Sequence, residues 1–378
     1  MTSLARSLLP AGIMLLLWTT LLASPAAANG VGTVYVASEG ASSITVIDSN
    51  TNAPVEVIPL KLPPRSLVFS PDARWVYVSH RDSNVISFLD TSIEDITSSI
   101  RLGGQVGQLA ITSGGTWLLA PDPLQGVLRV VDTASRAELF SVPVGGEPEN
   151  VAAAPDGTTA FVADGASGTI TMVDLKNRAV IRTINTQPGR RFPSLSPAPT
   201  SAELLVAGDA GDQLQVVDAE TGRLKRTLQV SPASAAAVFS PTGELAYLPR
   251  LGRAEVTIVS TASGNSVGSI SLPGEPAGIG ISRDGAKAFV AIPSKDQVAV
   301  LDLTQKKVSA LVSVDSGPTR VAVSPLQSRP QPIVMPGALP NTGGGPADQP
   351  SSLLIGAVLA AVGLAVIIGA RRLSWRRG

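Results

Sequence analysis

Leu128-Arg129-Val130-Val131-Asp132 is a short, mostly apolar run that ends on an aspartate. Side chains in such a run alternate between the two faces of a β-strand, and an aspartate at its end suits a turn. The same pattern recurs at residues 44–48, 86–90, 170–174, 214–218, 256–260 and 298–302, with Ser260 in place of the aspartate in one copy. Its last positions (48, 90, 132, 174, 218, 260 and 302) are separated by 42 residues, except for one interval of 44.

A period in the forties that carries strands indicates the blades of a β-propeller. Each repeat contains four short runs rich in Val and Ile, separated by turn-forming residues. In the third repeat they are residues 151–154, 160–163, 169–174 and 179–184. We name them strands A, B, C and D from the propeller axis outward. Such runs are expected to pair as antiparallel strands.

Recurring turn residues support this register. Proline stands 23 residues after five of the seven C-strand ends, mostly as Ser-Pro-Asp, Ala-Pro-Asp or Ser-Pro-Thr. We therefore expect the two extra residues of the long interval to follow Pro197, within residues 198–203. The repeated aspartates are interpreted as Asx turns into strand D and not as catalytic carboxylates. Trp75 and Trp117, 42 residues apart, are expected to pack between blades.

The two ends of the array complete one blade. The repeats begin with a B strand at residues 34–37 and end with an A strand at residues 320–323. Joining first to last removes the open sheet edge. The predicted fold is all-β, a seven-bladed β-propeller of four-stranded antiparallel blades over residues 29–326, expected to be monomeric.

Both termini have their own chemistry. Arg6, an apolar run at 8–22 and small residues at 26–28 predict a cleaved signal peptide over residues 1–28. Residues 327–352 are rich in Pro and Gly and predict a linker. Residues 353–370 are uncharged and long enough for a transmembrane helix, and the basic tail at 371–378 is expected to stay cytoplasmic. An ordinary membrane tether is the alternative for the C-terminus.

The linker contains Leu339, Pro340, Asn341, Thr342 and Gly343. Followed by an apolar span and an arginine tail, this pentapeptide resembles the Leu-Pro-x-Thr-Gly signal of sortase substrates. The resemblance implies cleavage between Thr342 and Gly343 and attachment to the cell envelope. Signal peptidase and sortase are thus the expected processing partners, and the propeller is expected on the extracellular side.

Composition excludes several kinds of site. The chain has no cysteine and one histidine, His80, which excludes thiolate metal sites, thiol nucleophiles and multi-histidine metal sites. Without residues 1–28 and those after Thr342, 24 basic and 28 acidic residues remain, so no nucleic-acid footprint is expected. No cofactor and no metal are predicted.

The repeats resemble the YVTN family of bacterial seven-bladed propellers, which includes lactonase-like members. The resemblance rests on Val34-Tyr35-Val36-Ala37-Ser38, Val76-Tyr77-Val78-Ser79, Val46-Ile47-Asp48 and Ser70-Pro71-Asp72, and covers about residues 33–325. The literal Tyr-Val-Thr-Asn string is absent, so the resemblance concerns the repeats and implies no particular activity.

Candidate binding residues lie in the irregular segments. The B–C loops and D–A connections differ between repeats and are expected on one face of the propeller, near its axis. Their candidate contacts to an anion or partner are Arg65, His80, Arg81, Glu149, Arg190, Arg191, Arg250 and Arg320. The alternative is that these loops are simply solvated.

Two function classes follow. The first is a non-enzymatic, surface-displayed module that binds an extracellular protein or glycan at the loop face. The alternative is an exported lactonase-like hydrolase in which Glu149 acts as a base and Arg65 or Arg320 holds the substrate. No catalytic residue is assigned beyond this weak candidate. A redox propeller with a bound cofactor is disfavoured by the missing cysteines and the single histidine.

Overall fold

The computed structural model describes residues 32–186, 194–199, 201–207, 213–229, 237–250 and 252–325. The predicted signal peptide, linker, sorting signal, transmembrane helix and basic tail lie outside these residues, as do Arg190 and Arg191. Within the described ranges, no helix is long and apolar enough to cross a membrane.

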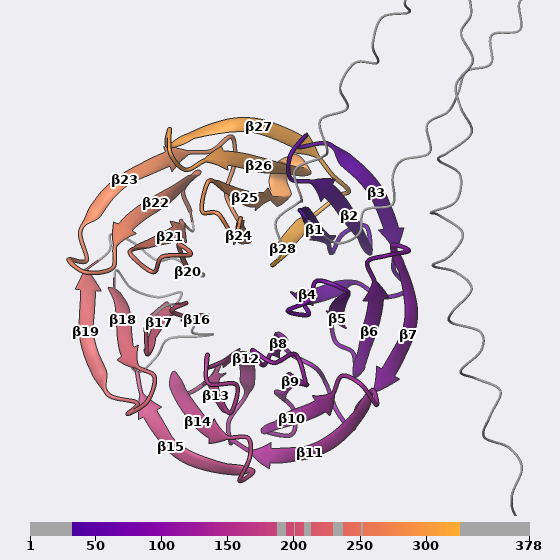
Figure 1. Ribbon diagram of the computed structural model, residues 1–378, viewed down its shortest axis with the longest axis vertical. Helices are drawn as coiled ribbons and strands as arrows, with labels where there is room; N and C mark the ends of the chain where they lie inside the picture. Colours follow the sequence, from indigo (N-terminus) through magenta and orange to yellow (C-terminus); the bar gives the residue numbers. More distant parts are fainter. Residues whose placement is uncertain are drawn as a thin grey trace, which may run out of the picture. The chain divides into compact units, whose positions relative to one another are not determined.

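The described residues form seven four-stranded antiparallel sheets arranged as a ring (Figure 1). The A strands lie nearest the axis: β28 (Pro318–Val323), β4 (Pro64–Phe69), β8 (Ala110–Ile111), β12 (Pro148–Ala153), β16 (Ser194–Pro197), β20 (Val238–Phe239) and β24 (Ile279–Ile281). The B strands are β1 (Thr33–Ser38), β5 (Trp75–His80), β9 (Trp117–Asp122), β13 (Thr159–Asp164), β17 (Glu203–Ala207), β21 (Leu245–Pro249) and β25 (Lys287–Ile292).

The outer half of each blade is equally regular. The C strands are β2 (Ser43–Asp48), β6 (Val85–Asp90), β10 (Val127–Asp132), β14 (Thr169–Asp174), β18 (Gln213–Asp218), β22 (Glu255–Ser260) and β26 (Gln297–Asp302). The D strands, on the periphery, are β3 (Pro54–Pro59), β7 (Asp95–Arg101), β11 (Ala137–Pro143), β15 (Ala179–Asn185), β19 (Leu224–Gln229), β23 (Ser266–Ser271) and β27 (Lys307–Ser313). A short 3-10 helix, η1 (Pro293–Lys295), lies between β25 and β26.

The ring closes as predicted. Strand β28, from the end of the array, pairs antiparallel with β1 from its beginning and completes the blade β28-β1-β2-β3. We call this blade 1 and number the others along the chain, from blade 2 (β4–β7) to blade 7 (β24–β27). The all-β, seven-bladed fold is therefore confirmed.

The apolar core lies between the blades. Each hydrophobic cluster joins residues of two neighbouring blades, and one cluster occupies each of the seven seams among the described residues. Trp75 and Trp117 pack against two of these clusters, which confirms their predicted place between blades. A C strand such as β10 is buried on both faces, because a blade covers each side of it.

The repeated aspartates act as turn residues. Asp132 Oδ1 accepts hydrogen bonds from the backbone N–H and the hydroxyl of Ser135. Asp174 and Asp218 accept equivalent bonds in their own blades. These hydrogen bonds lower the pKa of Asp132, Asp174 and Asp218. The predicted Asx turns are present.

The predicted place of the two extra residues is wrong. Strand β16 ends at Pro197 and β17 begins at Glu203, so their turn is as long as the one between Ala153 and Thr159. By contrast, 12 positions separate the ends of β15 and β16 (185 and 197), against 10 for β11 and β12 (143 and 153). The extra residues therefore precede β16, and Pro199, not Pro197, is the turn proline equivalent to Pro155.

Candidate functional site

The candidate site is a group of charged residues where the innermost strands begin. In an antiparallel blade the B–C loops and D–A connections emerge at the same end, which we call the loop face. Five residues there form what we call the rim cluster: Glu39, Arg65, Arg81, Glu149 and Arg320. They come from blade 1, blade 2 and blade 4.

Two bulges position its central ion pair. Arg65 and Glu149 are each the second residue of an A strand, at the point where a bulge interrupts pairing with the B strand. Such a bulge re-aims the side chain of its extra residue. The Arg65 guanidinium donates to Glu149 Oε2, and both side chains are largely buried. Arg65 Nε is buried without a hydrogen-bond partner.

A glycine of blade 3 makes this contact possible. The pair joins blade 2 to blade 4 and therefore passes the intervening A strand. At the equivalent bulge position stands Gly107, where an added Cβ would lie 2.6 Å from the backbone oxygen of Glu149. That oxygen accepts a hydrogen bond of 2.9 Å from the backbone N–H of Gln108. Any larger residue at position 107 would push the two strands apart.

Arg320 adds a second guanidinium near the first. It lies on β28, and its side chain is half-buried. Burial and the nearby positive charge of Arg65 lower the pKa of Arg320, while Glu39 opposes that effect. Among the described residues Arg320 forms no ion pair. Glu39 is itself paired with Arg81, whose side chain is mostly exposed.

Two other predicted contacts lie inside the protein. His80 is 2% exposed and Arg250 is 3% exposed, so neither presents its side chain on the surface. His80 Nε2 lies 2.8 Å from the hydroxyl of Ser87, and its Nδ1 lies 3.1 Å from the backbone oxygen of Leu62. Burial lowers the pKa of His80, which favours the neutral ring.

Both belong to a buried position that recurs at the end of the B strand. In blade 3 this position is Asp122, and Arg129 on the neighbouring C strand donates to it over 2.8 Å. In blade 6 it is Arg250, whose guanidinium lies 3.4 Å from the hydroxyl of Thr257 and whose pKa is lowered by burial. The residues at this position brace the B–C hairpin from inside.

The Asp122–Arg129 pair was not anticipated from the sequence. Arg129 is 6% exposed and also contacts Glu138 over 2.8 Å. Space for the pair comes from Gly103 and Gly104, since a Cβ at Gly104 would overlap Asp122 Oδ2. The sequence does show a charged residue, Arg129, inside an apolar strand and seven positions after Asp122. Its partner was evident only from the strand pairing.

Comparison with known proteins supports the fold. The family model "Cytochrome D1 heme domain" matches residues 29–147, less than half of the chain, corresponding to the first three blades. A search of curated proteins returns no match.

Many solved structures are similar, and three of them serve as examples. Hydrazine synthase of Kuenenia stuttgartiensis is 22% identical with a TM-score of 0.61, over 70% of this chain and 91% of that one. Dihydro-heme d1 dehydrogenase NirN, in complex with DHE, is 17% identical with a TM-score of 0.59, over 77% of this chain and 66% of that one. A functionally unknown protein from Desulfotomaculum acetoxidans is 13% identical with a TM-score of 0.69, over 79% of this chain and all of that one. Identities this low show a shared fold only.

The described residues do not fit an axially ligated haem. The one histidine is His80, whose ring nitrogens both face protein oxygens, and the sequence has no cysteine. Tyr35, Tyr77 and Tyr247 are at most 3% exposed, and Met172 is 4% exposed in a seam away from the rim cluster. The described part of the chain also contains no group of three or more His, Cys, Asp or Glu able to hold a metal.

Proposed function

We propose that the protein is an exported, envelope-anchored β-propeller that binds an anionic group of an extracellular protein or glycan at its loop face. The observation that carries this proposal is the half-buried Arg320 guanidinium, which lies beside Arg65 and forms no ion pair with another described residue. Holding two like charges close together in a partly desolvated place costs free energy. A bound carboxylate, sulfate or phosphate would offset that cost by pairing with Arg320.

The neighbouring charges shape the site. Arg65 is held by Glu149, so its guanidinium is oriented before any ligand arrives. Arg81 is mostly exposed and paired with Glu39, which makes it a peripheral contact. The anionic group of a ligand would therefore pair mainly with Arg320 and make a second contact with Arg65.

Binding of acidic probes tests the proposal. We expect a hexaglutamate peptide or a carboxylated oligosaccharide to bind in a salt-dependent way, with neutral hexaglutamine and the uncharged oligosaccharide as controls. Arg320→Gln should weaken binding about tenfold or more, because hydrogen bonds to charged groups are among the stronger ones. Arg223→Gln, which changes an exposed arginine in the C–D turn of blade 5 at the end opposite the loop face, should leave binding unchanged.

The unliganded protein provides a second measurement. Because Arg320 lies near Arg65, Arg320→Gln should slightly raise the free energy of unfolding while it weakens binding. Loss of binding by the Arg223 variant and not by the Arg320 variant would refute the proposed face.

The hydrolase alternative rests on Glu149. Its carboxylate lies close to a guanidinium that could hold an anionic substrate, but one of its oxygens accepts from Arg65. A general base needs an oxygen within reach of the substrate proton. We therefore favour the binding module. Turnover of a lactone panel that Glu149→Gln abolishes would instead support the hydrolase.

Anchoring is a separate part of the proposal and rests on Leu339–Gly343 and the apolar, arginine-tailed end of the chain. Mass spectrometry of envelope fractions should find a mature C-terminus at Thr342, linked to an envelope amine. Thr342→Ala should abolish this processing. A mature protein that retains residues 353–377 would overturn sortase anchoring in favour of a membrane tether.

A further inference from the structure

The seam between blades 4 and 5 differs from the other seams at the end opposite the loop face. Three positions recur there: the first residue of strand B, a residue in the middle of strand D, and the fifth residue of the C–D turn counted from the aspartate. The turn residue has a left-handed backbone in every blade: Asn52, Glu94, Arg136, Arg178, Gly222, Gly264 and Lys306. Its side chain, where present, points toward the preceding blade.

Large side chains fill most of these seams. Between blades 2 and 3, the guanidinium of Arg136 lies 4.8 Å from the ring centre of Trp75 and 5.1 Å from that of Phe88. Between blades 3 and 4, Arg178 lies 4.5 Å from the ring centre of Phe140. In both seams a guanidinium from the later blade covers an aromatic ring of the earlier one.

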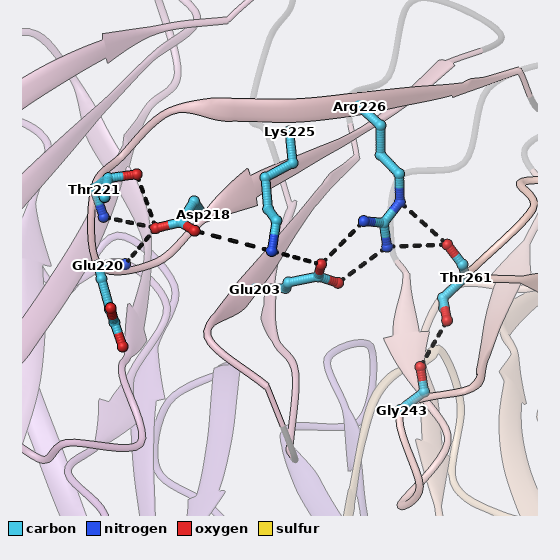
Figure 2. A network of polar contacts seen from close by, with 8 residues as sticks. All are labelled: Glu203, Asp218, Glu220, Thr221, Lys225, Arg226, Gly243 and Thr261. Atoms are coloured by element: carbon cyan, nitrogen blue, oxygen red, sulfur yellow. Dashed lines mark hydrogen bonds and ion pairs between the residues drawn. The ribbon is translucent and has the colours of Figure 1, made fainter.

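Between blades 5 and 6 the guanidinium comes from the earlier blade. Arg226 on β19 donates to both carboxylate oxygens of Glu203 over 3.0 Å and to the backbone oxygen of Thr261 across the seam (Figure 2). Lys225 lies 3.1 Å from Glu203 on the other side (Figure 2). Gly264 leaves room at the turn position, where a Cβ would lie 2.9 Å from Leu228. The seam is thus closed by a network of charges.

Between blades 4 and 5 the equivalent residues are small or apolar. Thr159 takes the place of Glu203, Ile181 that of Lys225, and Ala219 that of Thr261. The equivalent arginine, Arg182, is exposed and forms no hydrogen bond or ion pair with another described residue. Its stem lies over Gly222, with Cδ 2.7 Å from where a Cβ of that glycine would be. Among the described residues, no guanidinium makes the contacts in this seam that Arg226 makes with Glu203 and Thr261 in the next one.

A pocket of about 580 Å³ lies at this place. Its walls are largely apolar and include Met172, Ile181 and Ala202, while two carboxylates, Asp156 and Glu220, also line it. Among the described residues, no basic residue belongs to the lining. Small-molecule pockets typically measure about 300 to 1,000 Å³ and combine apolar walls with a few polar groups.

We infer that this pocket binds an organic cation, a guanidinium, amidinium or ammonium group carried on an apolar body. Two independent observations lead to it. The equivalent slot of the next seam holds a guanidinium, and the described lining of this one combines apolar walls with two carboxylates and no basic residue. The site is separate from the rim cluster, which we propose binds an anion. It therefore does not depend on the proposed function.

Benzamidine is a suitable probe, and neutral benzamide is its matched control of nearly the same shape. We expect benzamidine to bind the purified full-length protein at one site, about fivefold or more tighter than benzamide, because the carboxylates of Asp156 and Glu220 line the pocket. Binding can be located by NMR of methyl-labelled methionine. The chain has four methionines, and only the signal of Met172, assigned with Met172→Leu, should shift.

Two variants test the pocket itself. Thr159→Trp introduces the residue that Trp75 and Trp117 provide at the equivalent position, so it should fold and abolish binding. Glu220→Gln, at an exposed position, should weaken benzamidine binding about two- to fivefold without changing benzamide binding. Glu244→Gln, in the A–B turn of blade 6, is the matched control and should change neither.

The outcomes are decisive in both directions. Equal affinities for benzamidine and benzamide, or an unchanged affinity in Glu220→Gln, would overturn the cation assignment. Binding that persists in a folded Thr159→Trp protein, or the absence of saturable binding, would overturn the pocket. If Thr159→Trp does not fold, the Met172 signal and the Glu220 variant still decide the question.

Discussion

Glu94 should make the stability of the propeller depend on pH near neutrality. It is the turn residue that reaches from blade 2 into the seam with blade 1, where the hydroxyl of Tyr35 donates to its Oε2 over 2.5 Å. Its Oε1 is buried without a hydrogen-bond partner. The pKa of Glu94 is raised to about 7. Burial is the largest cause and the negative charges of Glu56 and Asp90 add to it, while the Tyr35 hydrogen bond opposes the rise.

The direction in which stability changes with pH follows from the difference between the folded and unfolded pKa values of Glu94. In the unfolded chain Glu94 has the ordinary glutamate pKa of 4.5, so between pH 4.5 and about 7 the folded protein binds the proton more tightly. This contribution to stability is fully present below pH 4.5 and is lost as the pH rises through about 7. The full shift corresponds to about 3 kcal/mol. Because Glu94 is half-buried, solvent screening reduces the expected effect to about 1 to 2 kcal/mol.

Glu94→Gln replaces the carboxyl with a neutral group of the same size. Urea unfolding of both proteins at pH 5 and pH 8 should show the variant about 1 to 2 kcal/mol more stable relative to wild type at pH 8 than at pH 5. His80 has a lowered pKa, which makes stability rise with pH in the same range. This contribution is the same in both proteins and cancels when they are compared. A difference between the two proteins that does not change with pH would refute the reasoning.

Three further predictions concern buried contacts. Arg129→Met should cost about 3 to 5 kcal/mol in urea unfolding, because it leaves the carboxylate of Asp122 buried and unpaired, whereas the double variant with Asp122→Leu should recover most of the loss. Gly104→Ala should destabilise the protein by about 1 to 3 kcal/mol, since the added methyl group overlaps the same carboxylate. Gly114→Ala is the control, because its methyl group would meet only an ordinary contact at 3.8 Å. Equal thermal midpoints of the two variants would contradict this prediction. Arg136→Met should lower the free energy of unfolding by about 1 kcal/mol by removing cation–π contacts to the rings of blade 2, and an unchanged midpoint would show that these contacts contribute nothing.

Most of the fold could be predicted because its signals are local. Alternating apolar residues set each strand, and the aspartate after Val131 bonds to the backbone three residues later, whatever the rest of the chain does. The fixed period then gives seven blades and closure by the last strand. The place of the two extra residues was missed because Pro197 and Pro199 are both near a turn, and only strand pairing distinguishes them.

The candidate site was predictable only in part. The sequence assigned Arg65, Arg81, Glu149 and Arg320 to irregular segments, and all four do lie at the loop face. Only Arg81 lies in a loop, however, because the other three belong to the first residues of A strands. It did not indicate that His80, the last residue of β5, is buried. Exposure of a loop residue depends on the neighbouring blade, and a repeat pattern says nothing about that neighbour.

Sequence alone therefore determined the seven-bladed, all-β architecture and the residues that form its turns. The tertiary structure decided which charges meet: Arg65 with Glu149, 84 residues away, and Arg129 with Asp122 beneath two glycines. It also decided that one seam of the ring contains a pocket, because that depends on side-chain sizes contributed by two blades at once. Periodicity describes what every blade shares, whereas pairing and packing across the seams depend on how each blade differs from the next.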